Sequence, residues 1–451
     1  MTEVESGSPE AQLASFAAKL RWEDIPERVR HEARRSLLNV FATALAGCRE
    51  PAIDITIRAM FPYTGARTAT IIGHNERGDA GLAAFVNAMS ANIFDFDDTH
   101  QATVLHPAAP VFSALFAHAE TQAISGAEVL HGFVVGGEVE CRIANAVSPY
   151  HYARGWHITS TCGVFGAATG VGAMLGLDDA QMLHAMSTAA AQSSGLVETL
   201  GTMAKSTSVG GAARNGLVSA QLARNGFTGP LTPLSGQRGY LRVYADRPRL
   251  EALTEDLGTE WEIATNTYKP YPGGIVLHPL IDAFLELHDR DGVRLDDVAS
   301  IKVTGHPLLR ERTDRPDVTT GREAQVSAQH TASIVLLRGS AGLDEFTDEA
   351  VAETIRAGRP PFTFQDDETR KIESAEVVVH LQSGDTLRKN IKAALGSSPN
   401  PLSDAQLEDK LTEMALRVGF KGDTPRLIDS IWHIDDLKDA GDIMRLAAGR
   451  E

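Results

Sequence analysis

The stretch from residue 155 to residue 177 is Gly-Trp-His-Ile-Thr-Ser-Thr-Cys-Gly-Val-Phe-Gly-Ala-Ala-Thr-Gly-Val-Gly-Ala-Met-Leu-Gly-Leu. It carries no formally charged residue over 23 positions, about the length of a bilayer-spanning helix. Its six glycines and its polar entry of histidine, threonine and serine instead favour a helix buried in protein. Small residues let neighbouring helices approach closely, so we expect a helical domain packed around this segment.

The sequence on both sides of this stretch, from residue 1 to about residue 265, predicts helix after helix. Few runs alternate between apolar and polar residues here. Helix boundaries are marked by Asp24 and Pro26, by the capping-box pairs Ser125/Glu128 and Asp178/Gln181, and by the terminator Asn225-Gly226.

The pattern changes after Trp261. Residues 298–305 and 375–382 alternate at period two, and residues 386–391 follow a turn signal as a return strand, with helical patterns between them at 279–289 and 328–338. A Gly/Pro-rich linker at 396–401 precedes a capped helix that begins after Ser403. The expected fold is mainly α: a large all-α domain over 1–265, completed by 403–451, and a smaller α+β domain over 266–402.

Composition excludes several classes of function. The chain has 451 residues, 43% apolar and 22% charged, which argues against a disordered chain and a multi-span membrane protein. Its net charge of −17 argues against non-specific nucleic-acid binding. Cys48, Cys141 and Cys162 form no CxxC pair, which argues against a zinc ribbon, a dithiol motif or an iron–sulfur cluster. With the acidic N-terminal segment MTEVESGSPE, this predicts a cytoplasmic protein without a targeting signal.

Several residues are candidates for chemistry. Residues 95–100 are Asp-Phe-Asp-Asp-Thr-His, and His106-Pro follows, so carboxylates and imidazoles cluster between apolar helices. His157 lies beside hydroxyls at the start of the glycine-rich helix, Lys205 stands alone among small residues, and Lys269 precedes Pro-Tyr-Pro-Gly-Gly. The structural alternatives are a solvated loop, a core histidine and a surface lysine. P-loop, dinucleotide-binding and nucleophile-elbow motifs are absent.

Read together, five stretches resemble the MmgE/PrpD family, which includes 2-methylcitrate dehydratase, cis-aconitate decarboxylase and iminodisuccinate epimerase. The matching stretches lie at 94–120, 155–177, 203–230, 268–287 and 400–411. The resemblance implies a helical domain with a smaller α+β lid, a homodimer, and a small di- or tricarboxylate substrate. It also implies that neither a metal nor an organic cofactor takes part.

The resemblance also implies the site. It makes Asp95, His106, His157 and Lys205 catalytic, with Asp95 orienting an imidazole from the helical domain. Substrate-binding roles fall on Thr99, Lys269, Ser208, His278 and His330. The family pattern is broken at two of these: many members have histidine where Ser208 stands, and tyrosine where His330 stands.

Four functions follow as hypotheses. The first is a cofactor-independent dehydratase that abstracts a proton next to a carboxylate on a hydroxy acid such as 2-methylcitrate. The alternatives are an epimerase or racemase of a dicarboxylate, a decarboxylase of the cis-aconitate type, and a non-catalytic carboxylate-binding protein.

Overall fold

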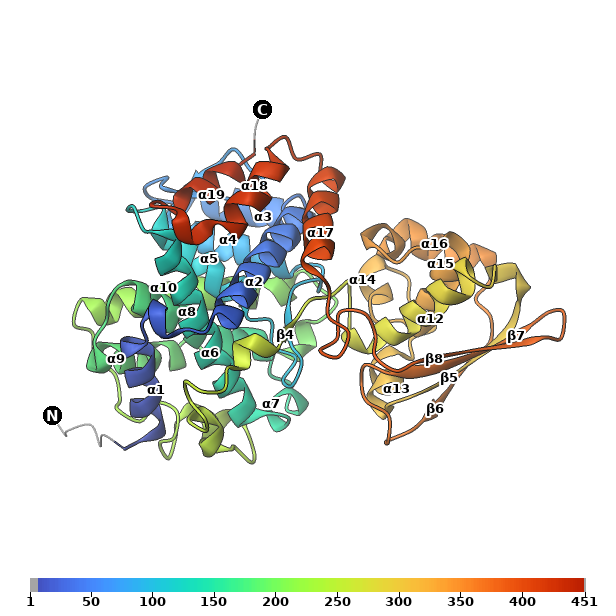
Figure 1. The fold of residues 1–451 in the computed structure, drawn as a ribbon, viewed down its shortest axis with the longest axis horizontal. Coiled ribbons are helices and arrows are strands. Elements are labelled where there is room, and N and C mark those ends of the chain that lie inside the picture. Colours follow the sequence, from blue (N-terminus) through green and yellow to red (C-terminus); the bar gives the residue numbers. More distant parts are fainter. Residues whose placement is uncertain (1–6, 450–451) are drawn as a thin grey trace. The chain divides into compact units, whose positions relative to one another are not determined.

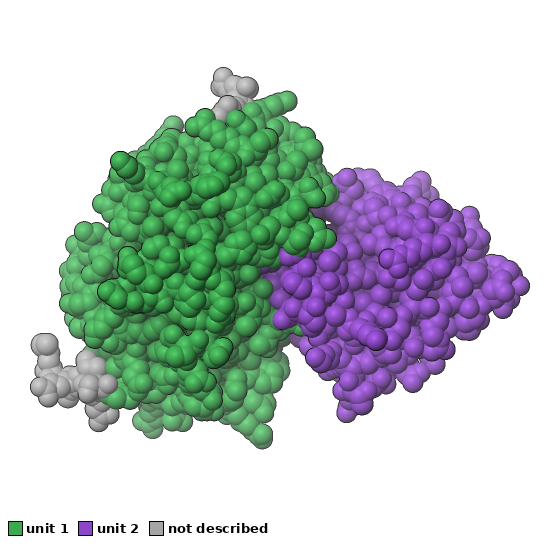
Figure 2. Space-filling view, viewed as in Figure 1, with its two compact units in different colours: residues 1–93, 97–266, 403–451 green, residues 94–96, 267–402 purple. Residues whose placement is uncertain are grey.

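The computed structural model describes residues 7–449, and Figure 2 colours its two compact units. Unit 1 comprises the residues up to 93, 97–266 and those from 403 onward; unit 2 comprises 94–96 and 267–402. The sequence predicts that residues 94–96 belong to the helical domain, whereas in the structure they group with the α+β unit. The first six residues of the acidic N-terminal segment lie outside the described range.

Unit 1 is helical, as the sequence predicted (Figure 1). Its short strands are β1 (Ala69–Thr70), β2 (Arg77–Gly78), β3 (Thr99–His100) and, at the boundary with unit 2, β4 (Asn266–Thr267). Its helices are α1 (Pro9–Lys19), α2 (Glu27–Gly47), α3 (Pro51–Met60), α4 (Ala80–Asn92), α5 (Ala108–Ala119), α6 (Gly126–Val147), α7 (Tyr150–Ala153), α8 (Ile158–Met174), α9 (Asp179–Ala190), α10 (Ala204–Arg224), α11 (Tyr240–Tyr244), α17 (Asp404–Arg417), α18 (Thr424–Trp432) and α19 (Gly441–Leu446).

The glycine-rich stretch forms α8, which packs between α6 and α10. A Cβ placed on Gly136 of α6 would lie 2.4 Å from the carbonyl oxygen of Gly166 on α8. A Cβ on Gly216 of α10 would lie 2.8 Å from the carbonyl oxygen of Val164. These backbones approach closely because the glycines have no side chains. Within residues 7–449, every helix is too short or too polar to span a bilayer.

Most predicted helix boundaries of unit 1 are confirmed. Both capping boxes form, and Gly226 follows α10 with a φ of +86°. The start of α2 differs from the prediction, because Pro26 rather than Asp24 is the N-cap residue. The Asp24 carboxylate instead forms an ion pair with Arg21 at 2.7 Å.

Unit 2 combines a four-stranded sheet with helices, and α12 and α15 cover one face of that sheet (Figure 1). The strand order is β6-β5-β7-β8, with β5 parallel to β6 and antiparallel to β7. Strand β6 is not among the strands that the sequence predicted, and its residues are half-buried or exposed. The elements are α12 (His278–Asp289), β5 (Val298–Gly305), α13 (Pro307–Thr313), α14 (Gly321–Ala324), α15 (Ala328–Arg338), α16 (Asp348–Ala357), β6 (Phe362–Asp366), β7 (Ala375–Leu381) and β8 (Thr386–Ile391).

Candidate active site

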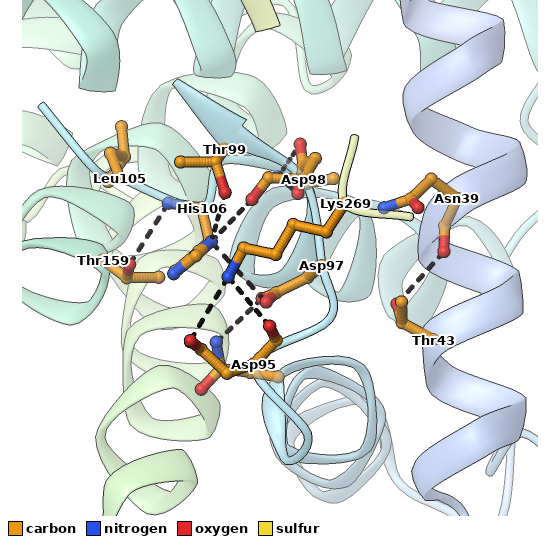
Figure 3. Close-up of polar contacts among 12 residues, drawn as sticks. Asn39, Thr43, Asp95, Asp97, Asp98, Thr99, Leu105, His106, Thr159 and Lys269 are labelled. Carbon is orange, nitrogen blue, oxygen red and sulfur yellow. Dashed lines mark hydrogen bonds and ion pairs between the residues drawn. The ribbon is translucent and has the colours of Figure 1, made fainter. Parts of the chain in front are cut away.

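His106 lies between β3 and α5, and its ring is fixed through Nδ1 (Figure 3). Nδ1 is 2.6 Å from the carbonyl oxygen of Asp98, 3.3 Å from Thr99 Oγ1 and 3.5 Å from Asp97 Oδ1. A carbonyl oxygen can only accept, so Nδ1 carries the proton and Nε2 holds the lone pair of the neutral ring. Nε2 is therefore the atom of His106 that can exchange a proton with a ligand.

Asp97 and Asp98 are consecutive and fully buried. Asn92 donates to Asp97 at 2.8 Å, and the backbone N–H of Ala108 donates to Asp98 at 3.1 Å, at the first residue of α5. Burial, and then the neighbouring charge of Asp97, raise the pKa of Asp98 to about 7. Because Nδ1 of His106 donates to a backbone oxygen, Nδ1 itself is not available as a metal ligand.

His157 is the N-cap residue of α8 and is held in a similar way. The backbone N–H of His157 donates to the carbonyl oxygen of Gly195 at 3.1 Å, and the ring Nδ1 lies 3.0 Å from Ser160 Oγ. The Ser160 hydroxyl donates to the backbone oxygen of His157, so it accepts from Nδ1. His157 thus also keeps Nε2 as its proton-exchanging atom.

Lys205 and Ser208 lie in the first two turns of α10, and Ser208 lies close to the first turn of α8. Ser208 Oγ donates to the carbonyl oxygen of Lys205 at 2.9 Å, and the Lys205 side chain is buried. Gly195 lies between α8 and α10, since a Cβ there would meet Ser160 Oγ at 2.1 Å and Ser208 Cβ at 3.3 Å.

The N-terminal ends of three helices therefore meet in unit 1. Besides the α8–α10 contact at Gly195, the backbone N–H of His106, just before α5, donates to Thr159 Oγ1 in the first turn of α8 at 3.2 Å. Helix N-termini carry partial positive charge, and together with a buried lysine they favour an anionic ligand.

In unit 2, Lys269 and Asp95 form a second pair (Figure 3). The ammonium of Lys269 donates to the backbone oxygen of Asp95 at 2.8 Å and lies 3.3 Å from its Oδ2. Asp95 has a φ of +53°, and Gly273 N–H donates to its carbonyl oxygen at 3.2 Å. Asp97 Oδ1 lies 3.5 Å from Nδ1 of His106, and the role of Asp95 in orienting an imidazole stays a prediction.

The other predicted histidines of unit 2 have different surroundings. His278 begins α12, is buried, and meets the ring of Tyr271 edge-on at 5.6 Å. His330 donates from Nε2 to the Glu345 carbonyl oxygen at 2.8 Å, and its Nδ1 lies 3.1 Å from Thr354 Oγ1. Burial lowers the pKa of His330 to about 4. Both ring nitrogens of His330 form hydrogen bonds inside unit 2, so His330 is not part of the site proposed below.

Sequence reasoning did not assign roles to four residues that hold the histidines. They are Asp97, Asp98, Thr159 and Ser160. All four stand within three positions of a predicted site residue. A search for hydroxyls and carboxylates next to those residues in the sequence would therefore have found them.

Fold and site define a two-unit protein whose helical unit presents two oriented imidazoles and a buried lysine near helix N-termini. Residues 11–253 match the model of the MmgE/PrpD N-terminal domain, and residues 271–434 match that of the MmgE/PrpD C-terminal domain. The chain belongs to the MmgE/PrpD family.

Curated relatives cover almost the whole chain. It is 27% identical to the cis-aconitate decarboxylase-like protein oryM of Aspergillus oryzae, over 98% of each chain. It is 24% identical to a cis-aconitate decarboxylase of Aspergillus terreus, over 97% of this chain and 95% of the relative. It is 25% identical to the cis-aconitate decarboxylase of Homo sapiens, over 94% of this chain and 91% of the relative.

Proposed function

We propose that the protein is a lyase that removes one carboxylate, as CO₂, from an unsaturated tricarboxylate of the cis-aconitate kind. The observation that carries the proposal is the pair of Nε2 atoms, on His106 and His157, beside the N-terminal ends of α5, α8 and α10. The names of the relatives, which match this chain over nearly its full length, support the same reaction.

This chemistry needs an anion site and a proton. Breaking the C–C bond releases CO₂, and the electron pair of that bond moves into the double bond conjugated with a remaining carboxylate. The fragment then takes up one proton, so each turnover consumes one proton. Transition-state charge builds up on carboxylate oxygens, and fixed cations and helix N-termini lower its energy.

We assign these tasks to the residues of unit 1. Lys205 and the helix N-termini hold substrate carboxylates, and Thr99 donates a hydrogen bond to the substrate. Protonated His106 or His157 supplies the proton from Nε2. Asp97 stabilises the imidazolium form of His106 from 3.5 Å. Lys269 and His278 of unit 2 stay predicted substrate-binding residues.

Dehydration is the second candidate function, because it is the first hypothesis that the sequence supports. A base that removes a proton next to a carboxylate and an acid that protonates a leaving hydroxyl would need the same imidazoles. The relatives are named as decarboxylases, so the hydro-lyase and epimerase readings rank below decarboxylation here.

Proton NMR in D₂O distinguishes these reactions. The panel comprises cis-aconitate, 2-methylcitrate, citrate, malate, tartrate and iminodisuccinate, each with and without EDTA. We expect CO₂ release from cis-aconitate with one deuterium in the product. New alkene signals from 2-methylcitrate would instead establish dehydration, and deuterium in a retained C–H would establish epimerisation. Loss of activity with EDTA would contradict the prediction that no metal takes part.

A further inference from the structure

Asp98 is the buried centre of a polar cluster in unit 1 that the proposed chemistry does not touch directly. Its carboxylate accepts from Asn266 Nδ2 at 2.6 Å and from Ala108 N at 3.1 Å. Its backbone oxygen holds Nδ1 of His106. The protonation state of this carboxylate therefore affects how firmly the first residue of α5 and the ring of His106 are held.

Lys410 of α17 reaches this cluster from a distant part of the chain. Its ammonium is buried and donates to Asn39 Oδ1 at 2.8 Å. Asn39 lies one turn after Ser36 on α2, and Ser36 Oγ accepts from the same Asn266 amide that binds Asp98, at 3.1 Å. Hydrogen bonds from Asn266 and Ala108, and then the positive charge of Lys410, lower the pKa of Asp98 against the raising effects of burial and of Asp97.

The neighbouring carboxylates Asp97 and Glu140 do not supply this compensation. Asp97 is a second carboxylate and raises the pKa of Asp98. Glu140 faces it from α6, fully buried against Gly166 of α8, and neither of its carboxylate oxygens has a hydrogen-bond partner among the described residues. Burial, and then the charge of Asp98, raise the pKa of Glu140 well above its ordinary value. His106 meets the backbone oxygen of Asp98 rather than its carboxylate.

We propose that Lys410 is a positioning residue of the active site: its buried ammonium compensates the charge of Asp98, so that Asp98 can cap α5 and hold Asn266 and His106 in place. An uncompensated carboxylate at this depth would take up a proton. Protonation would weaken its bonds from Ala108 and Asn266, and the peptide that orients His106 would lose its support.

A stability cycle tests the charge pairing without any substrate. The variants are Lys410→Met, Asp98→Asn and the double variant, with melting temperatures measured from pH 5.5 to pH 8.5. Asp98 is mostly protonated at pH 5.5, so its pairing with Lys410 contributes little there and most at pH 8.5. We expect the loss caused by Lys410→Met to be larger at pH 8.5 than at pH 5.5 by at least about 2 °C. In the Asp98→Asn background this extra loss should vanish.

The pH dependence of kcat tests the positioning role of Lys410, and only this second experiment rests on the proposed function. We expect Lys410→Met to move the acid limb of kcat toward higher pH by about one pH unit, with KM little changed, because Lys410 does not touch substrate. Lys410→Arg should restore the wild-type profile. The matched control is Lys389→Met, which removes a lysine 2.7 Å from Asp291 in unit 2 and should leave the profile in place.

Two results would overturn the proposal: a pH-independent loss of stability in Lys410→Met, or an additive cycle with Asp98→Asn at pH 8.5. A wild-type pH profile in Lys410→Met would overturn the positioning role. If no substrate of the panel turns over while the stability cycle shows the coupling, the proposed function fails and the pairing of Lys410 with Asp98 stands.

Discussion

The interiors of the two units are filled in different ways. In unit 1, α8 meets α6 and α10 at glycines, and buried carboxylates, histidines and lysines lie at the helix ends around this contact. In unit 2, the helices pack on the sheet through valine, isoleucine, leucine and phenylalanine side chains. Glycines bring the backbones of these three helices close together, and the polar groups of the candidate site lie at the helix ends beside this contact. The histidine His330 of unit 2 is part of its core instead.

Replacing a histidine of the candidate site in unit 1 is expected to have the largest effect on activity. His106→Gln and His157→Gln should each lower kcat by about 10²–10⁴, the usual contribution of a positioned acid or base. The control is His131→Gln on α6, whose Nε2 lies 2.8 Å from the carbonyl oxygen of Leu20 and which is not a residue of the candidate site. It should keep kcat within about twofold. Steady-state kinetics check this, and a loss under threefold in both site variants would contradict the assignment.

Two glutamates on one helix of unit 1 should respond in opposite directions. Glu138 is paired with Arg142 at 2.7 Å and accepts from the Ile263 N–H, whereas Glu140 has no such partner. Glu138→Met leaves a buried arginine uncompensated and should cost about 3–5 kcal/mol of unfolding free energy. Glu140→Met should be neutral or stabilising by about 1 kcal/mol. Chemical denaturation measures both, and equal losses would show that Glu140 is also paired.

Neighbouring glycines of α10 sharpen the packing argument. A Cβ on Gly210 would meet the carbonyl oxygen of Phe85 at 2.6 Å, whereas a Cβ on Gly211 would meet no atom within 4 Å. Gly210→Ala should therefore cost about 1–3 kcal/mol, and Gly211→Ala should add up to about 1 kcal/mol through helix propensity. Thermal melts of the two variants decide the signs, and a loss at both positions would mean that α10 is packed more uniformly than we infer.

The smallest expected effect concerns His330 in unit 2. Its pKa is lowered to about 4, below the value of about 6.5 in an unfolded chain, so the folded state resists its protonation. Its contribution to stability is present above pH 6.5 and is lost as the pH falls toward 4. His330→Gln should cost about 1 kcal/mol at pH 7 and give a flatter acid limb of stability than the wild type. Parallel acid limbs would mean that His330 is protonated in the folded state.

Sequence patterns predicted the fold class where local signals are strong. The capping pairs at Ser125 and Ser403 are confirmed, as are the strands beginning at Val298 and Thr386. Asp24 failed as a cap because its carboxylate pairs with Arg21, a choice that local propensity does not decide.

The candidate site was less accessible to sequence reasoning. His106 and His157 both lie beside the first turn of α8, where Thr159 contacts the backbone of His106 and Gly195 contacts that of His157. Each of these partners stands far along the chain from the histidine that it contacts. Lys410 belongs to the cluster around Asp98 only because α17 returns to unit 1, and such long-range contacts leave no local pattern.

The route of the chain through the two units also orders its folding during synthesis. Residues 267–402 form one continuous stretch of unit 2, and they leave the ribosome before α17 does. Until then the first part of unit 1 carries the adjacent carboxylates Asp97 and Asp98 without the ammonium of Lys410. The helical unit therefore cannot complete its packing until the residues from 403 onward have left the ribosome.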